Sequence, residues 1–383
     1  MAQNLGQISN VCFSKQLSLR PTTAAKTGES SSAPIFIQPP PRSRSTNISS
    51  LLSLPLSSIP LSGKIETEKL TRIQRVGAMA VDDVGSPVRY AVVTGANKGI
   101  GLETVRQLAT AGVTVILTAR NENRGKEATS KLHQSGLSNV VFHQLDVLET
   151  ESIKSLAKFI ETEFGRLDIL VNNAGASGVV VDEDGLRTLN VDPANWLAGK
   201  AVNVVQDVIK TTYEAAKLCL DTNYYGVKNV TEALLPLVQR STSGARIVNI
   251  SSLRSELKRI PDDQRRKELG DIDTLTEEKI NAILQQFLGD LKHDALEANG
   301  WQKMLPAYSI SKASLNAYTR VLAKKYPDMC INCVHPGFVK TDINWNTGIM
   351  TVEEGAAGPV MLALLPQGGP TGSYFDTTKL AEF

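Results

Sequence analysis

Tyr308 and Lys312 are four residues apart, a spacing that places both side chains on one face of a helix. A phenol beside an ammonium group is suited to proton transfer, because the cation stabilises the phenolate and lowers the tyrosine pKa from about 10. Spacing alone does not select this pair, because it recurs in Tyr213 with Lys217 and in Tyr224 with Lys228. The surrounding elements must decide between the three pairs.

A glycine-rich stretch, TGANKGIG from Thr94 to Gly101, lies between an apolar run and a helical pattern. Glycines at a strand-to-helix turn let the backbone approach a pyrophosphate, and the helix start supplies free N–H groups. The alternative is an ordinary tight turn. We expect the turn to bind a dinucleotide cofactor through Gly95, Asn97, Lys98, Gly99, Ile100 and Gly101.

The second apolar run ends in ILTAR, so Arg120 stands where an NAD-dependent enzyme carries an acid for the ribose 2′-hydroxyl. Arg120 and Lys98 supply positive charge instead. Positive charge suits a 2′-phosphate and predicts NADPH as the cofactor. Solvated surface cations are the alternative for both side chains.

Short β-branched runs alternate with helical patterns from about residue 90 onward. This order predicts an α/β fold with a single Rossmann-type doubly wound parallel sheet and helices on both faces. Ligands then bind at the carboxyl ends of the strands. The expected strands are 90–94, 113–117, 140–143, 168–171, 246–250, 331–334 and 373–375.

Six motifs follow one another along the chain: TGANKGIG, LDV (145–147), NNAG (172–175), NISS (249–252), YSISK (308–312) and HPGFVKT (335–341). With these motifs in this order, the chain resembles the short-chain dehydrogenase/reductase family from about residue 88 to its carboxyl terminus. The phrases TNYYGVKNV and VEEGAAGPVMLALLPQGGPTG are similar to the plant menthone, neomenthol and salutaridine reductase group, which is related to monomeric carbonyl reductases. The motif order selects Tyr308 and leaves the pairs at Tyr213 and Tyr224 as helix-surface pairs.

The resemblance implies four catalytic residues. Tyr308 donates a proton to the carbonyl oxygen, and Ser252 hydrogen-bonds that oxygen, with Ser251 as the fallback. Lys312 keeps the tyrosine acidic and binds the nicotinamide ribose, and Asn223 helps to hold a water that relays protons. The resemblance also implies further cofactor contacts from Asp146, Asn172, Ala174, Gly175, Pro336, Gly337 and Thr341.

The expected reaction is the reversible, NADPH-dependent reduction of a terpenoid- or alkaloid-like ketone to a secondary alcohol. The alternatives are an alcohol dehydrogenase or an enone C=C reductase on the same scaffold, and an NADP-binding protein without turnover. A net charge of +2 without a long basic block indicates a small-molecule partner and neither a nucleic acid nor a membrane surface.

Residues 253–307 form an insert between Ser252 and Tyr308. A helix is expected inside it, with Thr274 as the cap, Glu277 three residues on, and an apolar stripe from Ile280 to Leu291. In the carbonyl-reductase branch such an insert covers the helix surface used for dimerisation, so we expect a monomer. We also expect the insert, residues 178–196 and the tail near Phe375 to wall an apolar substrate pocket.

Residues 1–78 differ in composition from the folded domain expected over 86–383. Their first 63 residues are rich in serine and contain Glu29 as the only acid, which is typical of an organelle transit peptide. The alternatives are a disordered tail or a start at Met79. The compartment is therefore either the plastid or the cytoplasm.

Cys330 and Cys333 resemble half a metal site, but in a strand they point to opposite faces, and no metal is expected.

Overall fold

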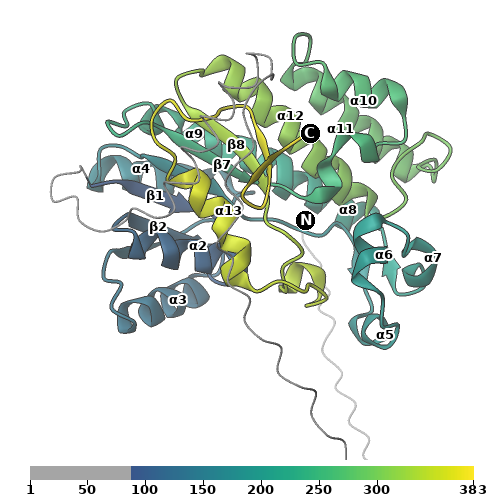
Figure 1. The fold of residues 1–383 in the computed structure, drawn as a ribbon, viewed down its shortest axis with the longest axis horizontal. Helices are drawn as coiled ribbons and strands as arrows, with labels where there is room; N and C mark the ends of the chain where they lie inside the picture. Colours follow the sequence, from purple (N-terminus) through teal and green to yellow (C-terminus); the bar gives the residue numbers. More distant parts are fainter. Residues whose placement is uncertain (1–87) are drawn as a thin grey trace, which may run out of the picture. The chain divides into compact units, whose positions relative to one another are not determined.

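The computed structural model describes residues 88–383, so the predicted presequence, residues 1–78, lies outside the described residues. Eight strands form one sheet in the order β10-β9-β8-β7-β4-β1-β2-β3 (Figure 1). Every neighbouring pair is parallel except β9 with β10. The strands are β1 Tyr90–Val93, β2 Thr114–Ala119, β3 Val140–Gln144, β4 Ile169–Asn172, β7 Arg246–Ile250, β8 Cys330–His335, β9 Tyr374–Asp376 and β10 Lys379–Ala381.

All seven predicted strands are present, and the doubly wound parallel sheet is confirmed. The strand order changes direction at β1, because β2 and β3 lie on one side of it and β4, β7, β8 and β9 on the other. In such a sheet the loops at the carboxyl ends of β1 and β4 part at this point and leave a crevice. The crevice is where the predicted cofactor motifs belong.

Helices cover both faces of the sheet, because successive residues of each buried strand point to opposite sides. In β1, Val92 packs with one apolar cluster while Ala91 and Val93 pack with the other. One face carries α2 Gly99–Thr110, α3 Glu122–Gln134 and α13 Val352–Ala363 (Figure 1). The other carries α4 Thr150–Glu163, α8 Tyr213–Leu220, α9 Val227–Val238, α10 Asp263–Gly270, α11 Glu277–Lys292 and α12 Pro306–Lys325.

The predicted insert helix is α11, and its apolar stripe is buried as expected, with Phe287 fully covered. It packs against α12 and α8. The expected cap, Thr274, is wrong: Thr276 caps α11 by accepting the N–H of Lys279, while the Thr274 hydroxyl donates to Asp271. Both threonines precede acidic residues, so the sequence pattern did not separate them. The insert also contains the short helices η2 Leu253–Ser255 and η3 Leu257–Arg259.

Residues 180–210 form a small unit, here called the cap. Its apolar cluster contains Leu186, Trp196 and Val205, joined by Met304 from the end of the insert. None of its short strands was predicted, because two-residue strands carry almost no periodicity. The elements of the cap are β5 Val180–Val181, α5 Glu183–Thr188, α6 Pro193–Ala198, α7 Val202–Val205 and β6 Ile209–Lys210.

The Phe375 side chain lies in the core, while the predicted pocket wall from the tail around it stays a prediction. Phe375 lies in β9, is 2% exposed, and packs in the core beneath α2 and α13. An aromatic residue close to the chain end has no sequence feature that separates a core strand from a pocket wall. Among residues 88–383, no helix is both long and apolar enough to span a membrane.

Candidate active site

The predicted site residues lie at the carboxyl edge of the sheet. The glycine-rich turn follows β1, Arg120 follows β2, Asp146 follows β3, and NNAG begins at the end of β4. Ser252 follows β7, and the stretch from Pro336 follows β8. Parallel pairing brings these six loops to one side, so motifs far apart in the sequence meet there.

Tyr308 and Lys312 lie one turn apart on α12. The helix begins at Pro306, directly after Leu305 in a left-handed conformation with φ 50°, so the chain turns sharply just before the tyrosine. Lys312 is 3% exposed, and its Nζ donates to the carbonyl of Ile250 at 2.7 Å. The same Nζ lies 5.8 Å from the centre of the Tyr308 ring. The lysine therefore ties α12 to the end of β7.

Ser252 faces Tyr308 closely enough for its side-chain hydrogen bond to lower the tyrosine pKa. Its own carbonyl accepts hydrogen bonds from the hydroxyls of Ser255 and Tyr374. The fallback Ser251 is 2% exposed and donates to Asn316 at 2.5 Å inside the core. Of the two serines, only Ser252 faces the phenol.

Burial shifts both members of the predicted pair toward their neutral forms. It raises the pKa of Tyr308 to about 12, against the lowering effects of Ser252 and Arg254. Burial also lowers the pKa of Lys312 to about 8. The expected acidifying effect of Lys312 on Tyr308 stays a prediction, because the cation that lowers the tyrosine pKa in this structure is Arg254.

The other two tyrosine–lysine pairs lie away from this edge. Tyr213 is exposed at the start of α8, as expected for a surface residue. Tyr224 is fully buried, so its reading as a helix-surface residue is wrong. It packs edge-on against Tyr318 in the core, at a distance of 6.0 Å between ring centres. Lys228 forms ion pairs with Glu232 and Glu277.

Asn223 lies in η1, the π-helical turn Asp221–Gly226 that joins α8 to α9. Such single turns inside longer helices recur at functional sites. The Asn223 side chain accepts the N–H of Ala176 at 2.8 Å and donates to the Ala176 carbonyl and to Ser311, both at 3.0 Å. Its observed role is to fix the loop after NNAG, and the predicted water relay stays a prediction.

The glycine-rich turn is held by residues that the motif reading did not single out. The Thr94 hydroxyl accepts the N–H groups of Asn173 and Ala174, both at 2.9 Å. The Asn173 side chain donates to the carbonyls of Thr94 and Gly95. Asn173 therefore links the turn after β1 to the NNAG loop after β4. Its position inside NNAG was the available signal, but its partners were not readable from the sequence.

Close approach explains why glycine stands at two positions of the turn. Gly95 has φ 62°, and a Cβ there would lie 2.9 Å from the Cα of Ala174. A Cβ on Gly101 would lie 2.4 Å from the side-chain nitrogen of Asn173. Lys98 precedes α2 without any side-chain cap for the first turn, so that turn's N–H groups are free to bind a phosphate.

The two predicted 2′-phosphate cations differ in their surroundings. Arg120 is exposed at the end of β2. Lys98 is also exposed, but its Nζ forms a 2.6 Å ion pair with Asp342, which follows Thr341. A Cβ on Gly99 would touch the Thr341 methyl group at 3.5 Å, so the glycine-rich turn and the loop after β8 lie against each other.

The remaining predicted cofactor residues take several roles. Asp146 accepts the N–H of Leu148 at 3.0 Å, a turn at the strand end. The Asn172 side chain is buried and donates to Thr231 and Asn249, so cofactor contacts at this residue are left to its backbone. Gly337, after Pro336, has φ 95°. Ala174 and Gly175 belong to the loop that Asn223 fixes by accepting the N–H of Ala176.

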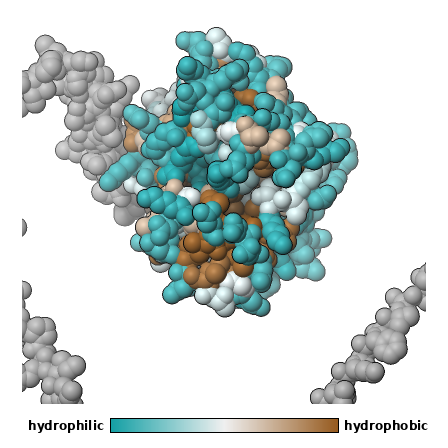
Figure 2. Space-filling view, turned by 90° about the vertical axis from the view of Figure 1, so that its right-hand side faces the viewer, coloured by the Kyte–Doolittle hydropathy of each residue, from teal (hydrophilic) through white to brown (hydrophobic). Residues whose placement is uncertain are grey.

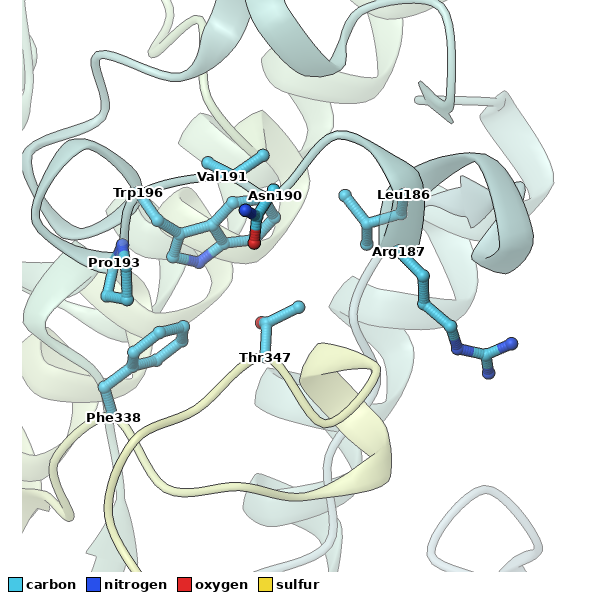
Figure 3. A pocket seen from close by; sticks show the side chains of 8 residues that line it. All are labelled: Leu186, Arg187, Asn190, Val191, Pro193, Trp196, Phe338 and Thr347. Atoms are coloured by element: carbon cyan, nitrogen blue, oxygen red, sulfur yellow. The ribbon is translucent and has the colours of Figure 1, made fainter. Parts of the chain in front are cut away.

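A cavity of about 200 Å³ lies between the cap and the loop after β8. Trp196 and Pro193 of α6 face Phe338 across it, while Arg187 points away (Figure 3). Residues 186–196 therefore line a cavity that no insert residue lines, and its use as the substrate pocket stays a prediction. Apolar surface gathers on the face that carries the cap, where Val180 and Val204 are exposed (Figure 2).

Comparisons with known proteins agree with this arrangement. The family model described as short chain dehydrogenase matches residues 89–261. Short-chain dehydrogenase/reductase 1 of Saponaria officinalis is 54% identical over 297 residues, which cover 77% of this chain and 96% of that protein. (+)-Neomenthol dehydrogenase of Arabidopsis thaliana is 48% identical over 299 residues, which cover 77% and 98%.

A solved structure and a more distant relative extend the comparison. The structure of salutaridine reductase from Papaver somniferum has a TM-score of 0.71 and 47% identity, covering 75% of this chain and 99% of that one. Carbonyl reductase (NADPH) 3 of Mus musculus is 36% identical over 287 residues, which cover 73% and 91%.

Proposed function

The chain belongs to the short-chain dehydrogenase family, and we propose that it catalyses the reversible, NADPH-dependent reduction of a ketone to a secondary alcohol. The observation that carries the proposal is that the Tyr308 and Ser252 side chains face each other beside the glycine-rich crevice, with Lys312 one turn along α12. A phenol and a hydroxyl at one point can donate to one carbonyl oxygen. A protein that only binds NADP, without turnover, has no need of the Tyr308 phenol and the Ser252 hydroxyl at one point.

The residues of the crevice fit a dinucleotide. The left-handed Gly95 and the uncapped start of α2 suit a pyrophosphate, and exposed Arg120 suits a 2′-phosphate. The name of the mouse relative, carbonyl reductase (NADPH) 3, supports the same choice of cofactor. NADPH, when bound, supplies the hydride for the carbonyl carbon.

The side chains then handle the proton and the charge. Tyr308 donates its proton to the carbonyl oxygen as the new C–H bond forms, and Ser252 donates a hydrogen bond to the same oxygen. Lys312, held against Ile250, carries positive charge beside the resulting phenolate. In the reverse direction the phenolate accepts the proton of the alcohol.

The substrate we propose is an apolar, terpenoid- or alkaloid-like ketone. The cavity between Trp196 and Phe338 has both apolar and polar walls, with Asn190 and Thr347 among the polar residues, and is large enough for part of a ring system. The names neomenthol dehydrogenase and salutaridine reductase, carried by similar plant proteins, agree with this class.

We also propose a monomer, because α11 covers α12 and α8 within one chain. Import of a tagged chain into plastids tests whether residues 1–78 direct it there or leave it in the cytoplasm.

The test is turnover by the full chain with NADPH or NADH over matched ketones, enones and alcohols, with product analysis. We expect ketones to give secondary alcohols with NADPH. Arg120→Ser should raise KM for NADPH about tenfold or more and leave KM for NADH unchanged, because NADH lacks the 2′-phosphate. A saturated ketone as the product of an enone would instead favour C=C reduction, and equal use of both cofactors would remove the role of Arg120.

Gly95→Ala should weaken NADPH binding about tenfold or more, measured by fluorescence titration. The added methyl group meets the backbone of Ala174 and pushes the NNAG loop from the crevice. Gly112→Ala is the matched control, because Gly112 is also left-handed, with φ 79°, but a Cβ there meets nothing within 4 Å. The control should lose about 1 kcal/mol of stability and keep its affinity for NADPH. Equal affinity in both variants would contradict the assignment of the turn.

A further inference from the structure

We infer that Arg254 is a positioning residue of the active site, which joins the cap to the segment that carries Ser252 and supplies positive charge that favours the Tyr308 phenolate. The inference rests on the proposed reductase function, because it concerns the proton that Tyr308 donates. No sequence motif singled out Arg254, and its role depends on contacts with two segments far apart in the chain.

Arg254 contacts both the catalytic serine and the cap. It lies in η2, two residues after Ser252, and its N–H donates to the Ser252 hydroxyl at 3.2 Å. Its Nη2 donates to the carbonyl of Trp196 at 2.6 Å, at the end of α6. Trp196 lines the cavity, so the Arg254 side chain binds the cavity wall while the Arg254 backbone binds the serine that faces Tyr308.

The charge of Arg254 has no carboxylate beside it. Within residues 88–383, Arg254 forms no ion pair, whereas the nearby Arg259 is bound to Glu256 at 2.8 Å. Arg259 also reaches the cap, because its Nη1 donates to the carbonyl of Leu197 at 3.1 Å. Burial of an unpaired cation is unfavourable, and it lowers the pKa of Arg254 to about 10. Arg254 therefore stays charged at neutral pH, and its field is not neutralised.

Three titratable side chains act on Tyr308 or contact its ring: Arg254 from η2, Cys219 from α8 and Lys312 from α12. Burial and Cys219 raise the tyrosine pKa, while Arg254 lowers it. Lys312 lies against the ring and donates to Ile250. Arg254 is thus the side chain placed to favour the phenolate that forms when Tyr308 gives up its proton.

The experiment compares the full-length wild type with Arg254→Met, Arg254→Lys and the matched control Arg259→Met. Arg254→Met loses the positive charge that favours the phenolate, so its kcat at pH 7 should drop about three- to tenfold. Arg254→Lys keeps the charge, so its kcat should stay close to that of the wild type while KM rises.

A second measurement does not depend on activity. Amide hydrogen exchange over residues 193–205 should be faster in Arg254→Met, because the hydrogen bond to Trp196 is lost. Arg259→Met removes the neighbouring bond to Leu197 and should speed exchange there, yet leave kcat unchanged, since Glu256 still pairs with Lys258.

An unchanged kcat in folded Arg254→Met, or an equal loss of kcat in Arg259→Met or in Arg254→Lys, would overturn the inference. Failure of the proposed function gives a different result: the wild type itself reduces no ketone, or Tyr308→Phe is as active as the wild type. The two failures are therefore distinguishable in one set of assays.

Discussion

Tyr308→Phe is expected to lower kcat/KM for ketone reduction by about a hundred- to ten-thousandfold, the contribution typical of a positioned general acid. The substitution removes only the hydroxyl that faces Ser252 and keeps the ring that packs in the site. NADPH binding, followed by fluorescence, should change little. Activity within threefold of the wild type would exclude Tyr308 as the proton donor.

The chain supplies its own controls for this experiment. Tyr213→Phe and Tyr224→Phe remove hydroxyls from tyrosines with the same spacing to a lysine. Tyr213 is exposed, and the buried Tyr224 hydroxyl has no partner in the described part of the chain. Both variants should keep wild-type activity, and Tyr224→Phe should be as stable as the wild type or more so, because an unpaired buried hydroxyl is unfavourable.

Lys312→Met is expected to lower kcat/KM about a hundredfold or more, because the cation beside the developing phenolate is lost. Lys228→Met is the matched control and should keep full activity, since Lys228 pairs with Glu232 and Glu277 away from the crevice. The assay is steady-state reduction at saturating NADPH. Comparable losses in the two variants would indicate a general effect of removing a lysine.

Lys312→Met and Lys228→Met should change stability in opposite ways as the pH rises. Burial lowers the pKa of Lys312 to about 8, from 10.5. Between these values the unfolded chain binds the proton and the folded chain does not, so rising pH stabilises the wild type relative to Lys312→Met. The difference in free energy of unfolding, wild type minus Lys312→Met, should increase by about 3 kcal/mol from pH 7 to pH 10.5. Denaturant titrations measure it.

Lys228 should behave in the opposite way. Burial lowers its pKa, but hydrogen bonds to Glu277 and Glu232 outweigh burial and raise it above the usual value. Its contribution to stability is present below pH 10.5 and is lost as pH rises through the folded-state pKa. Lys228→Met should therefore be less stable than the wild type at pH 7, and the difference should shrink at high pH. A pH-independent difference in both variants would contradict the assigned surroundings.

The strands and the position of the motifs were predictable from local pattern. A buried parallel strand is a short apolar run between turn residues, and all seven predicted runs are strands. Once the sheet is parallel, every motif at a strand end must lie at one edge, so the grouping of Gly95, Arg120 and Ser252 follows from order alone. The choice of Tyr308 among three spaced pairs also followed from motif order.

Side-chain partners were not predictable in this way. The hydrogen bonds of the Asn223 side chain to Ala176 and Ser311 had no signal in the sequence. Asn173, which binds the glycine-rich turn, was not singled out, and Phe375 lies in the core. Each of these depends on which segment packs opposite, and periodicity within one element carries no information about its neighbours.

By itself, the sequence determined the parallel sheet, the order of its loops and the identity of the residues at its edge, because strand period and motif order are local properties of the chain. Only the tertiary structure decided which charges act on Tyr308. Lys312 is its neighbour in the helix, yet it turns to Ile250, while Arg254 comes from another segment with no acid to neutralise it. Burial and the distance between charges set electrostatic effects, and both exist only in the packed chain.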